Sequence, residues 1–309
     1  MPELLSVVVP CYNEQETIGL FYDAILKEAA KLSILEWEFL FVDDGSQDHT
    51  LDKIKELQEL DTRVHYLSFS RNFGKEAAIY AGLRRAKGDY VVLMDADLQD
   101  PPELIGEMYR VVLEEDYDCT AARRVTRQGE PLLRSFFARC FYRLMNTISR
   151  TEFVDGARDF RLMRRQVVDS ILELTEYNRF TKGIFSWVGY RTKWLEYINV
   201  ERAAGTTKWS FWKLFLYSLD GIIAFTTAPL ALASVLGMVF FLIALVLIAL
   251  IIIRTLIFGD PTAGWPSLVC IICLIGGVQL FCTGIVGQYL ARTYLETKKR
   301  PVYIIREEK

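Results

Sequence analysis

The stretch VVLMDADLQDPPEL, which runs from Val91 to Leu104, changes from apolar to acidic within a few residues. Its first half has the character of a buried strand, and its second half holds Asp95, Asp97 and Asp100. Carboxylates at such close spacing raise one another's pKa and repel one another unless a positive charge offsets them. The stretch therefore predicts a buried strand that ends in a cation site or in open water.

Three earlier segments share this strand character, and helical segments separate them. The predicted strands cover residues 4–10, 37–44, 64–70 and 89–97, and the predicted helices cover residues 14–32, 49–60, 75–86 and 101–115. Short strands that alternate with helices indicate βαβ units and a parallel sheet. We therefore expect an α/β fold in which helices flank a parallel-rich sheet.

Polar loops follow three of the predicted strands. They are PCYNE at 10–14, DDGSQDHT at 43–50 and DADLQDPP at 95–102. Ligands of open parallel sheets bind beyond the carboxyl ends of the strands. A parallel arrangement would bring all three loops to one edge, and that edge is the predicted binding site.

The second half of the chain contains two long uncharged stretches, at residues 221–253 and 261–291. A membrane-spanning helix needs about 20 apolar residues, so each stretch can hold one span. A pair of buried core helices is the alternative. The segment 208–220 mixes aromatic residues with two lysines. This composition is typical of an amphipathic helix in the membrane interface, although a core helix can have the same pattern.

These features divide the chain into four parts. We expect a cytosolic α/β domain at 1–207, a juxtamembrane interfacial helix at 208–224, two transmembrane helices at 225–291 and a cytosolic tail at 292–309. Basic residues precede the first uncharged stretch and follow the second, whereas the connection 254–260 has one base and one acid. The positive-inside rule then predicts a multi-pass protein of the cell (inner) membrane with both termini in the cytoplasm.

The overall charge and the missing phosphate-loop motifs limit the class of ligand. The 309 residues have a formal net charge of −3, so no basic field indicates a nucleic-acid partner. No predicted strand is followed by GxGxxG, and GxxxxGK[ST] does not occur. A dinucleotide cofactor, or ATP held by a P-loop, is therefore not expected.

The acidic loop at 95–102 offers oxygen ligands to a metal. Asp95, Asp97 and Gln99 are suited to Mg²⁺ or Mn²⁺, which take some oxygens from protein and others from water and phosphate. Such a metal would neutralise the carboxylates and bridge to an anionic substrate. A DxD motif by itself is also typical of a solvated turn, so the neighbouring loops decide between the two.

The other two loops carry residues that suit a nucleotide. Asp43 and Asp44 can accept hydrogen bonds from a base or a ribose, and Tyr12, close to Glu14, can stack on a ring. Each loop alone is also typical of a strand-to-helix turn with an N-cap. Their combination at one edge favours a site for a nucleotide and its metal.

The motifs SVVVPCYNE, FVDDGSQDHT and VVLMDADLQDPPEL resemble the nucleotide-sugar glycosyltransferases of family two, which have the GT-A fold. Three later segments, DFRLMRRQVV, RFTKGIFSWVGY and ERAAGTTKWS, precede the two uncharged stretches. With them, the chain resembles bacterial polyprenyl-phosphate glycosyltransferases, relatives of dolichol-phosphate mannose synthase. The resemblance extends over essentially the whole chain and implies a Rossmann-like GT-A sheet with two C-terminal transmembrane helices.

The resemblance also implies roles for individual residues. The nucleoside would contact Pro10, Tyr12, Glu14, Val42 and Asp44. The diphosphate end and the rest of the substrate would be bound by Asp95, Ala96, Asp97, Arg123, Arg202 and Lys208. The metal, Mg²⁺ or Mn²⁺, would be held by Asp95, Asp97 and Gln99, and the expected catalytic residues are Asp97, Asp159 and Arg202. In the basic stretch 123–143, Arg134 is the candidate for the lipid phosphate, with a solvated helix face as the alternative.

The implied reaction is the metal-dependent, inverting transfer of a sugar from a nucleotide sugar to a membrane polyprenyl phosphate, for cell-envelope glycan modification. Asp159 replaces a small residue of the mannose synthases, so the expected donor is UDP-glucose or UDP-N-acetylglucosamine. We also expect a homo-oligomer. The alternatives are a processive polysaccharide synthase, whose QxxRW motif is missing here, and a non-catalytic, membrane-anchored nucleotide-binding assembly protein.

Overall fold

The structure is a computed structural model that describes residues 2–125, 142–149, 151, 153–197, 221–258 and 264–309. The chain separates into two compact units. One comprises Met1–Gly221 together with Arg300–Lys309, and the other comprises Ile222–Lys299. The predicted interfacial segment at 208–220 lies outside the described residues.

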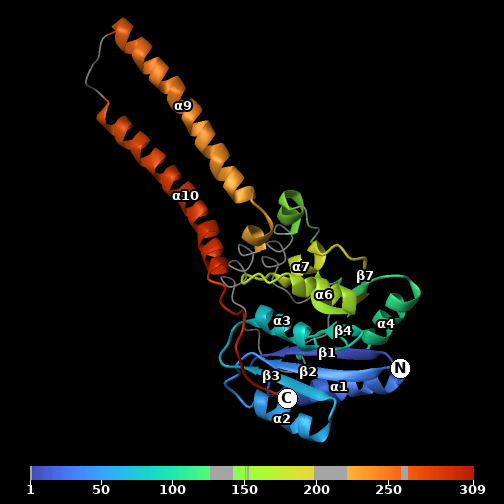
Figure 1. Cartoon of the computed structure of the whole chain (residues 1–309). Helices are drawn as coiled ribbons and strands as arrows, with labels where there is room; N and C mark the ends of the chain where they lie inside the picture. Colours follow the sequence, from blue (N-terminus) through green and yellow to red (C-terminus); the bar gives the residue numbers. More distant parts are fainter. Residues whose placement is uncertain (1, 126–141, 150, 152, 198–220, 259–263) are drawn as a thin grey trace. The chain divides into compact units, whose positions relative to one another are not determined.

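The described residues of the first unit form an eight-stranded sheet in the order β7-β5-β6-β4-β1-β2-β3-β8 (Figure 1). The strands are β1 (Leu4–Cys11), β2 (Glu36–Asp43), β3 (Val64–Phe69), β4 (Tyr90–Leu93), β5 (Cys119–Arg124), β6 (Ala157–Arg164), β7 (Thr192–Tyr197) and β8 (Ile305–Glu308). The first four strands are mutually parallel, and β5 is parallel to β7. The predicted α/β fold with a parallel-rich sheet is therefore confirmed. β6 and β8 are the antiparallel exceptions, since β6 pairs with β4 and β5, and β8 pairs with β3.

Helices flank this sheet on both faces. They are α1 (Ile18–Lys31), α2 (Thr50–Leu60), α3 (Lys75–Arg85), α4 (Leu104–Glu114), α6 (Arg165–Glu173) and α7 (Thr181–Trp187). In Figure 1, α1 and α2 lie on one side of β1–β3, and α3 and α6 lie on the other. Each of the first four predicted helices is present, although α1 and α4 begin a few residues after the predicted starts.

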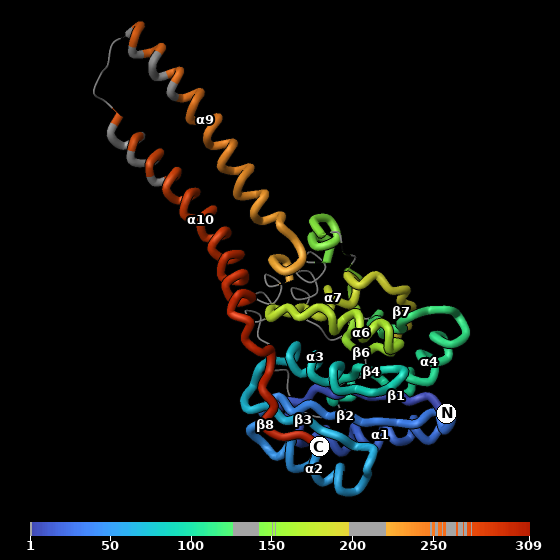
Figure 2. The backbone as a smooth tube through the Cα atoms, viewed as in Figure 1, coloured from blue at the N-terminus to red at the C-terminus, as the bar shows by residue number. Residues whose placement is uncertain are grey.

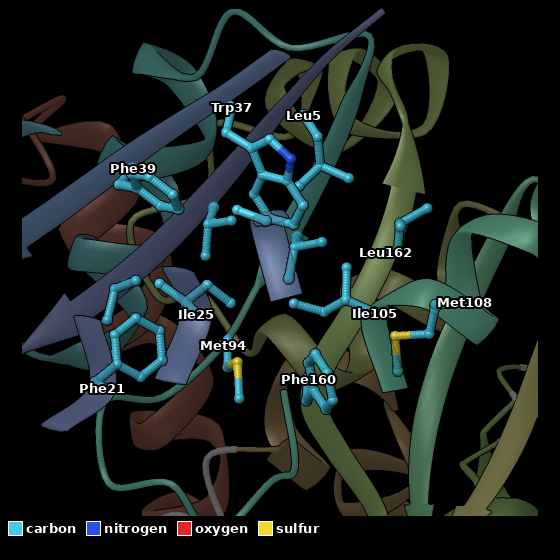
Figure 3. Packing of buried hydrophobic residues seen from close by; sticks show 14 of the residues in the cluster. Leu5, Phe21, Ile25, Trp37, Phe39, Met94, Ile105, Met108, Phe160 and Leu162 are labelled. Carbon is cyan, nitrogen blue, oxygen red and sulfur yellow. The ribbon is translucent and has the colours of Figure 1, made fainter. Parts of the chain in front are cut away.

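The core forms because successive residues of a strand point to opposite faces of the sheet. On one face, Leu5 of β1 packs in a single buried cluster with Phe21 of α1, Phe39 of β2 and Ile105 of α4 (Figure 3). On the other face, α3 approaches the sheet at Gly82, where an added Cβ would come within 2.3 Å of a Val8 methyl group. The amino end of α3 lies at the carboxyl edge of the sheet because α3 follows the end of β3.

The C-terminal residues complete the sheet at its far edge. β8 pairs with β3, and Ser70 donates its N–H to the Ile304 carbonyl (3.0 Å). The Tyr303 ring stacks on Phe69, with 5.1 Å between the ring centroids. Figure 2 shows the C-terminal segment alongside β3. Residues 300–309 are therefore part of the α/β unit.

The second unit contains two long apolar helices, α9 (Ala228–Phe258) and α10 (Trp265–Thr297). Ala228–Leu247 and Leu274–Thr297 are long and apolar enough to cross a membrane. Large apolar side chains such as Met238, Phe241 and Leu280 are exposed on these helices. A helix in a soluble core would bury such side chains, so this unit lacks the burial that the core-helix alternative requires.

Candidate active site

The carboxyl ends of β1, β2 and β4 lie on one edge of the sheet because the three strands are parallel. The loops at 10–14, 43–50 and 95–102 follow these ends, so they meet at this edge as predicted. Hydrogen bonds join the first two loops. Asn13 donates its N–H to the Ser46 hydroxyl (2.9 Å), and the Gln47 N–H donates to the Asn13 side-chain oxygen (2.8 Å). Asn13 takes a left-handed conformation, with φ of 54°.

The two aspartates at the end of β2, Asp43 and Asp44, accept hydrogen bonds from the protein itself. Asp43 accepts hydrogen bonds from the Ser46 N–H (3.0 Å) and the Ser68 hydroxyl (2.8 Å). Asp44 accepts the N–H groups of Phe73 (2.6 Å) and Gly74 (2.9 Å). Burial raises the pKa of Asp44 to about 6, although these two N–H groups oppose the change. Asp44 therefore fixes the loop between β3 and α3.

The loop after β4 is fixed by a second set of contacts. Leu98 has a left-handed φ of 55°, and the Gln99 N–H donates to Asp97 (3.1 Å). Arg158 donates to Asp100 (3.1 Å) and to the Gln99 side-chain oxygen (3.2 Å). Burial alone would lower the pKa of Arg158, but Asp100, Tyr197 and Asp95 together outweigh burial and raise it. The predicted metal ligand Gln99 thus has its oxygen on Arg158 in this structure.

Asp159 lies next to Asp95 because of the register between β4 and β6. The antiparallel pairs run from Tyr90↔Arg164 to Leu93↔Arg161. Two residues further in the same register, Asp95 is opposite Asp159. Residues 95 and 159 are far apart in sequence, and only this strand pairing brings their carboxylates together.

The Lys75 ammonium lies between these two carboxylates. Its Nζ is 2.7 Å from Asp95 Oδ1, 2.8 Å from Asp95 Oδ2 and 2.6 Å from Asp159 Oδ2. Lys75 is the first residue of α3 and follows Gly74, whose φ of 98° favours glycine. The three side chains keep 38%, 27% and 16% of their surface exposed, for Lys75, Asp95 and Asp159 respectively. A ligand in solution can therefore reach the cluster.

The charges of this cluster stabilise one another. Burial favours the neutral form of Asp159, but Lys75, Lys182 and Arg161 outweigh burial and lower its pKa below the ordinary range. Burial also disfavours the Lys75 ammonium, and the two carboxylates outweigh it and raise the Lys75 pKa. Asp159 is consequently ionised near neutral pH and is a weak base.

The site residues are suited to a hard divalent cation. Asp95 and Asp97 can supply carboxylate oxygens. The carboxylates of Asp95 and Asp159 already bind one cation, the Lys75 ammonium. Among the described residues, no group of three histidine, cysteine or carboxylate side chains could hold a metal by itself. Two carboxylates are enough for a Mg²⁺ site that takes its further oxygens from substrate phosphates and water.

The other predicted site residues divide into three groups. Pro10, near the end of β1, and Tyr12 and Glu14, in the loop after it, are partly exposed, whereas Val42, Asp44 and Ala96 are buried. Arg123, at the end of β5, donates to the Asp155 carbonyl (3.1 Å) and lies 3.6 Å from Glu196. Arg134, Arg202 and Lys208 lie outside the described residues.

Sequence reasoning did not identify Lys75 or Arg158. Lys75 begins the predicted helix 75–86, where a lysine is ordinary on a solvated face. A signal was nevertheless present, because Gly74 and Lys75 lie just beyond the end of the predicted strand 64–70. This was the one predicted strand for whose following loop no function was expected. A fourth parallel strand end must reach the same edge as the other three.

A cavity of about 330 Å³ borders this fourth loop, which joins β3 to α3. Its lining comes from residues 71–74, residues 177–179, Glu76, Ala77 and Val302. None of the predicted site residues that the structure describes lines it. Phe73 and Gly74 belong both to this lining and to the hydrogen bonds of Asp44.

Known proteins resemble this chain in sequence and in fold. The family described as "Glycosyl transferase family 2" matches residues 6–172. The "Prophage bactoprenol glucosyl transferase homolog" of Escherichia coli (strain K12) is 43% identical over 99% of both chains. The "Bactoprenol glucosyl transferase" of Shigella phage SfV is 44% identical over 99% of both chains. The crystal structure of mannosyl-3-phosphoglycerate synthase from Rubrobacter xylanophilus has a TM-score of 0.50, with 18% identity and 71% coverage of each chain, and this likeness concerns the fold alone.

A mostly parallel sheet with acidic loops along one edge, together with these relatives, defines a glycosyltransferase of the GT-A type. The family match covers more than half of the chain, and the relatives align over nearly all of it. The chain belongs to glycosyl transferase family 2. The resemblance inferred from the motifs and the assignment as an enzyme are both confirmed.

Proposed function

We propose that this glycosyltransferase transfers glucose from UDP-glucose to a polyprenyl phosphate in a single, inverting displacement. The observation that carries the proposal is the identity of 43–44%, over 99% of both chains, with relatives named as bactoprenol glucosyl transferases. UDP-N-acetylglucosamine is the second candidate donor from the sequence. The product would be a polyprenyl-phosphate sugar for modification of cell-envelope glycans.

In this proposal, Asp95 and Asp97 hold Mg²⁺ or Mn²⁺. The metal would act as a Lewis acid on the leaving diphosphate. Tyr12, Glu14 and Asp44 would contact the nucleoside from the other half of the edge. Arg123, Arg202 and Lys208 would stabilise the charge that develops on the diphosphate.

The acceptor phosphate does not need a general base. The second pKa of a phosphate monoester is about 6, so at neutral pH it is mostly a dianion. The lowered pKa of Asp159, next to Lys75, makes this carboxylate a poor proton acceptor. We assign to Asp159 the orientation of the acceptor or of a donor hydroxyl, and to Arg134 the binding of the lipid phosphate.

A water-insoluble acceptor accounts for the two apolar helices. We propose that α9 and α10 each cross the membrane. Residues 1–221 and 300–309 belong to one folded unit, joined by the β3–β8 pairing, so the chain between them must return to the side from which it left. The basic residues that follow Ala291 favour a cytoplasmic location for this side under the positive-inside rule.

The function is tested with the purified full-length protein, undecaprenyl phosphate and a panel of nucleotide sugars. We expect one glucose to be added per lipid, with release of UDP, in a reaction that excess chelator stops. Mass spectrometry of the lipid measures the product. A preference for N-acetylglucosamine would change the donor, a polymer on the lipid would favour the processive alternative, and absence of transfer from every donor would refute the proposal.

The topology is tested with single added cysteines in intact cells. A cysteine at Thr262, which lies outside the described residues, should react with an impermeant thiol reagent. A cysteine at the exposed Arg300 should react only after the cells are opened. The unmodified chain gives the background from the native cysteines, and the reverse labelling pattern would contradict the proposed orientation.

A further inference from the structure

The position of Lys75 is set by contacts on both sides of it. The preceding Gly74 donates its N–H to Asp44 (2.9 Å). The carboxylate of the following Glu76 accepts the Thr181 N–H (2.8 Å) at the start of α7. The backbone of Lys75 is therefore anchored to two separate parts of the α/β unit, and its ion pairs with Asp95 and Asp159 hold the ammonium at the edge.

The charge of Lys75 acts on two ligands in opposite directions. Asp95, Asp97 and Asp159 carry three negative charges, and Lys75 offsets one of them at hydrogen-bond distance from Asp95 and Asp159. A divalent cation that binds alone meets this ammonium and is repelled by it. Once the cation is bound, the same ammonium adds to a positive site that attracts the diphosphate of the donor.

We propose that Lys75 couples metal binding to donor binding. Its ammonium weakens the affinity for the divalent cation alone and strengthens the affinity of the metal-bound site for a nucleoside diphosphate. This inference rests on the proposed function, because it takes the donor to be a nucleotide sugar. The coupling is reciprocal: the factor by which the bound metal improves the affinity for the nucleotide is also the factor by which the bound nucleotide improves the affinity for the metal.

A structural role for Lys75 predicts a different result. If the ammonium only holds Asp95 and Asp159 in place, its removal should displace both carboxylates. The affinities for metal and for nucleotide would then both fall. The two accounts therefore differ in the sign of the change in metal affinity.

The test measures two dissociation constants of the full-length protein in detergent. The first is for Mn²⁺ without nucleotide, from the electron paramagnetic resonance signal of free Mn²⁺. The second is for UDP at saturating Mn²⁺, from calorimetry. Lys75→Met removes the charge, Lys75→Gln removes it but keeps a hydrogen-bond donor, and Lys75→Arg retains it. Lys53→Met, at an exposed position on α2, is the matched control.

In Lys75→Met and Lys75→Gln, Mn²⁺ alone should bind roughly tenfold more tightly and UDP with Mn²⁺ roughly tenfold more weakly, as expected for unit charges a few ångströms apart. Lys75→Arg and Lys53→Met should stay within about threefold of the wild type, which is small beside a tenfold effect. If Lys75→Met does not fold, the glutamine variant gives the same comparison. Any pattern other than opposite changes overturns the coupling.

Sugar transfer by the wild-type protein separates this inference from the proposed function. Transfer without the opposite changes in affinity rejects the coupling and leaves the function in place. Opposite changes without any transfer reject the proposed function and leave the coupling in place.

Discussion

The two halves of the sheet edge hold their carboxylates by different means. In the half that follows β2, Asp44 accepts hydrogen bonds from two backbone N–H groups of the loop before α3. In the half that follows β4, Asp95 and Asp159 share the side-chain ammonium of Lys75. The carboxylate of the first half is bound by backbone groups, and the carboxylates of the second half are bound by the end of a side chain.

This difference indicates which carboxylates can exchange their partners for a ligand. A backbone N–H belongs to its loop, so Asp44 cannot change partner without unfolding that loop. A side-chain cation can be joined or replaced by another cation with only a change in rotamer. We infer that the β2 half is preformed for the nucleoside and that the β4 half changes its charge balance during the reaction.

The largest effect is expected for Asp97→Asn. The variant loses one charge from the proposed metal site, and turnover should fall by about 100-fold or more, since metal-ion catalysis supplies several kcal/mol. Steady-state transfer to undecaprenyl phosphate measures the loss. Asp23→Asn, on an exposed position of α1, is the control and should keep wild-type turnover. Full activity of Asp97→Asn would contradict the proposal that Asp97 holds a metal needed for turnover.

The next effect is expected for Asp159→Asn. It keeps the shape of the side chain but removes a charge from the Lys75 pair, and turnover should fall by roughly 10- to 100-fold, the size of a lost orienting contact. The rate should stay low across pH 5.5–8.5, because the acceptor ionises without a base. Recovery to the wild-type rate as the phosphate ionises would mean that Asp159 is the proton acceptor.

A pH effect on stability is expected from Asp44. Its pKa is raised from an ordinary value near 4 to about 6 in the folded protein. Between these values the folded state holds a proton that the unfolded state has released, so the free energy of unfolding decreases as the pH rises from about 4 to about 6 and is constant above that. The decrease should be roughly 3 kcal/mol, because one pKa unit corresponds to about 1.4 kcal/mol. Chemical denaturation at several pH values measures this decrease. In Asp44→Asn the free energy of unfolding should not decrease in this way between about pH 4 and about pH 6. An equal decrease in the variant would assign the effect to another group.

The smallest effect is expected for Tyr303, which supports the same loop from the C-terminal segment through its stacking on Phe69. Tyr303→Leu should lower the free energy of unfolding by about 1 kcal/mol, as is typical of an aromatic pair, while Tyr303→Phe should change it little. Thermal unfolding of the two variants provides the comparison. If Tyr303→Leu weakens nucleotide binding more than Asp44→Asn does, the tail and not Asp44 holds the loop.

The parallel half of the fold was predictable because each element has a local signal. β1 to β4 are short apolar runs, and the helices between them have helical periodicity, so their order and the shared edge of Asp44 and Asp95 followed from the sequence. β8 has no such signal. Its sequence, Ile305–Glu308, has three charged residues of four, and it becomes a strand only because β3 offers an unpaired edge.

The centre of the site was only partly predictable, because only some of its residues have a local signal in the sequence. Asp95 and Asp97 stand out within one loop, whereas the proximity of Asp159 depends on the antiparallel register of β4 with β6. Lys75 depends in addition on the close packing of α3 at Gly82. These are contacts between distant parts of the chain, and no local pattern encodes them.

The contrast between the two halves is tested most directly by Mn²⁺ binding to Asp95→Asn and Asp44→Asn in the presence of saturating UDP. Asp95→Asn should lose Mn²⁺ binding, because it removes a charged ligand from the proposed metal site. Asp44→Asn should bind Mn²⁺ with an affinity within about threefold of the wild type, because its partners are backbone groups of the other half. Retention of Mn²⁺ by Asp95→Asn, or its loss from Asp44→Asn, would contradict this division of the edge.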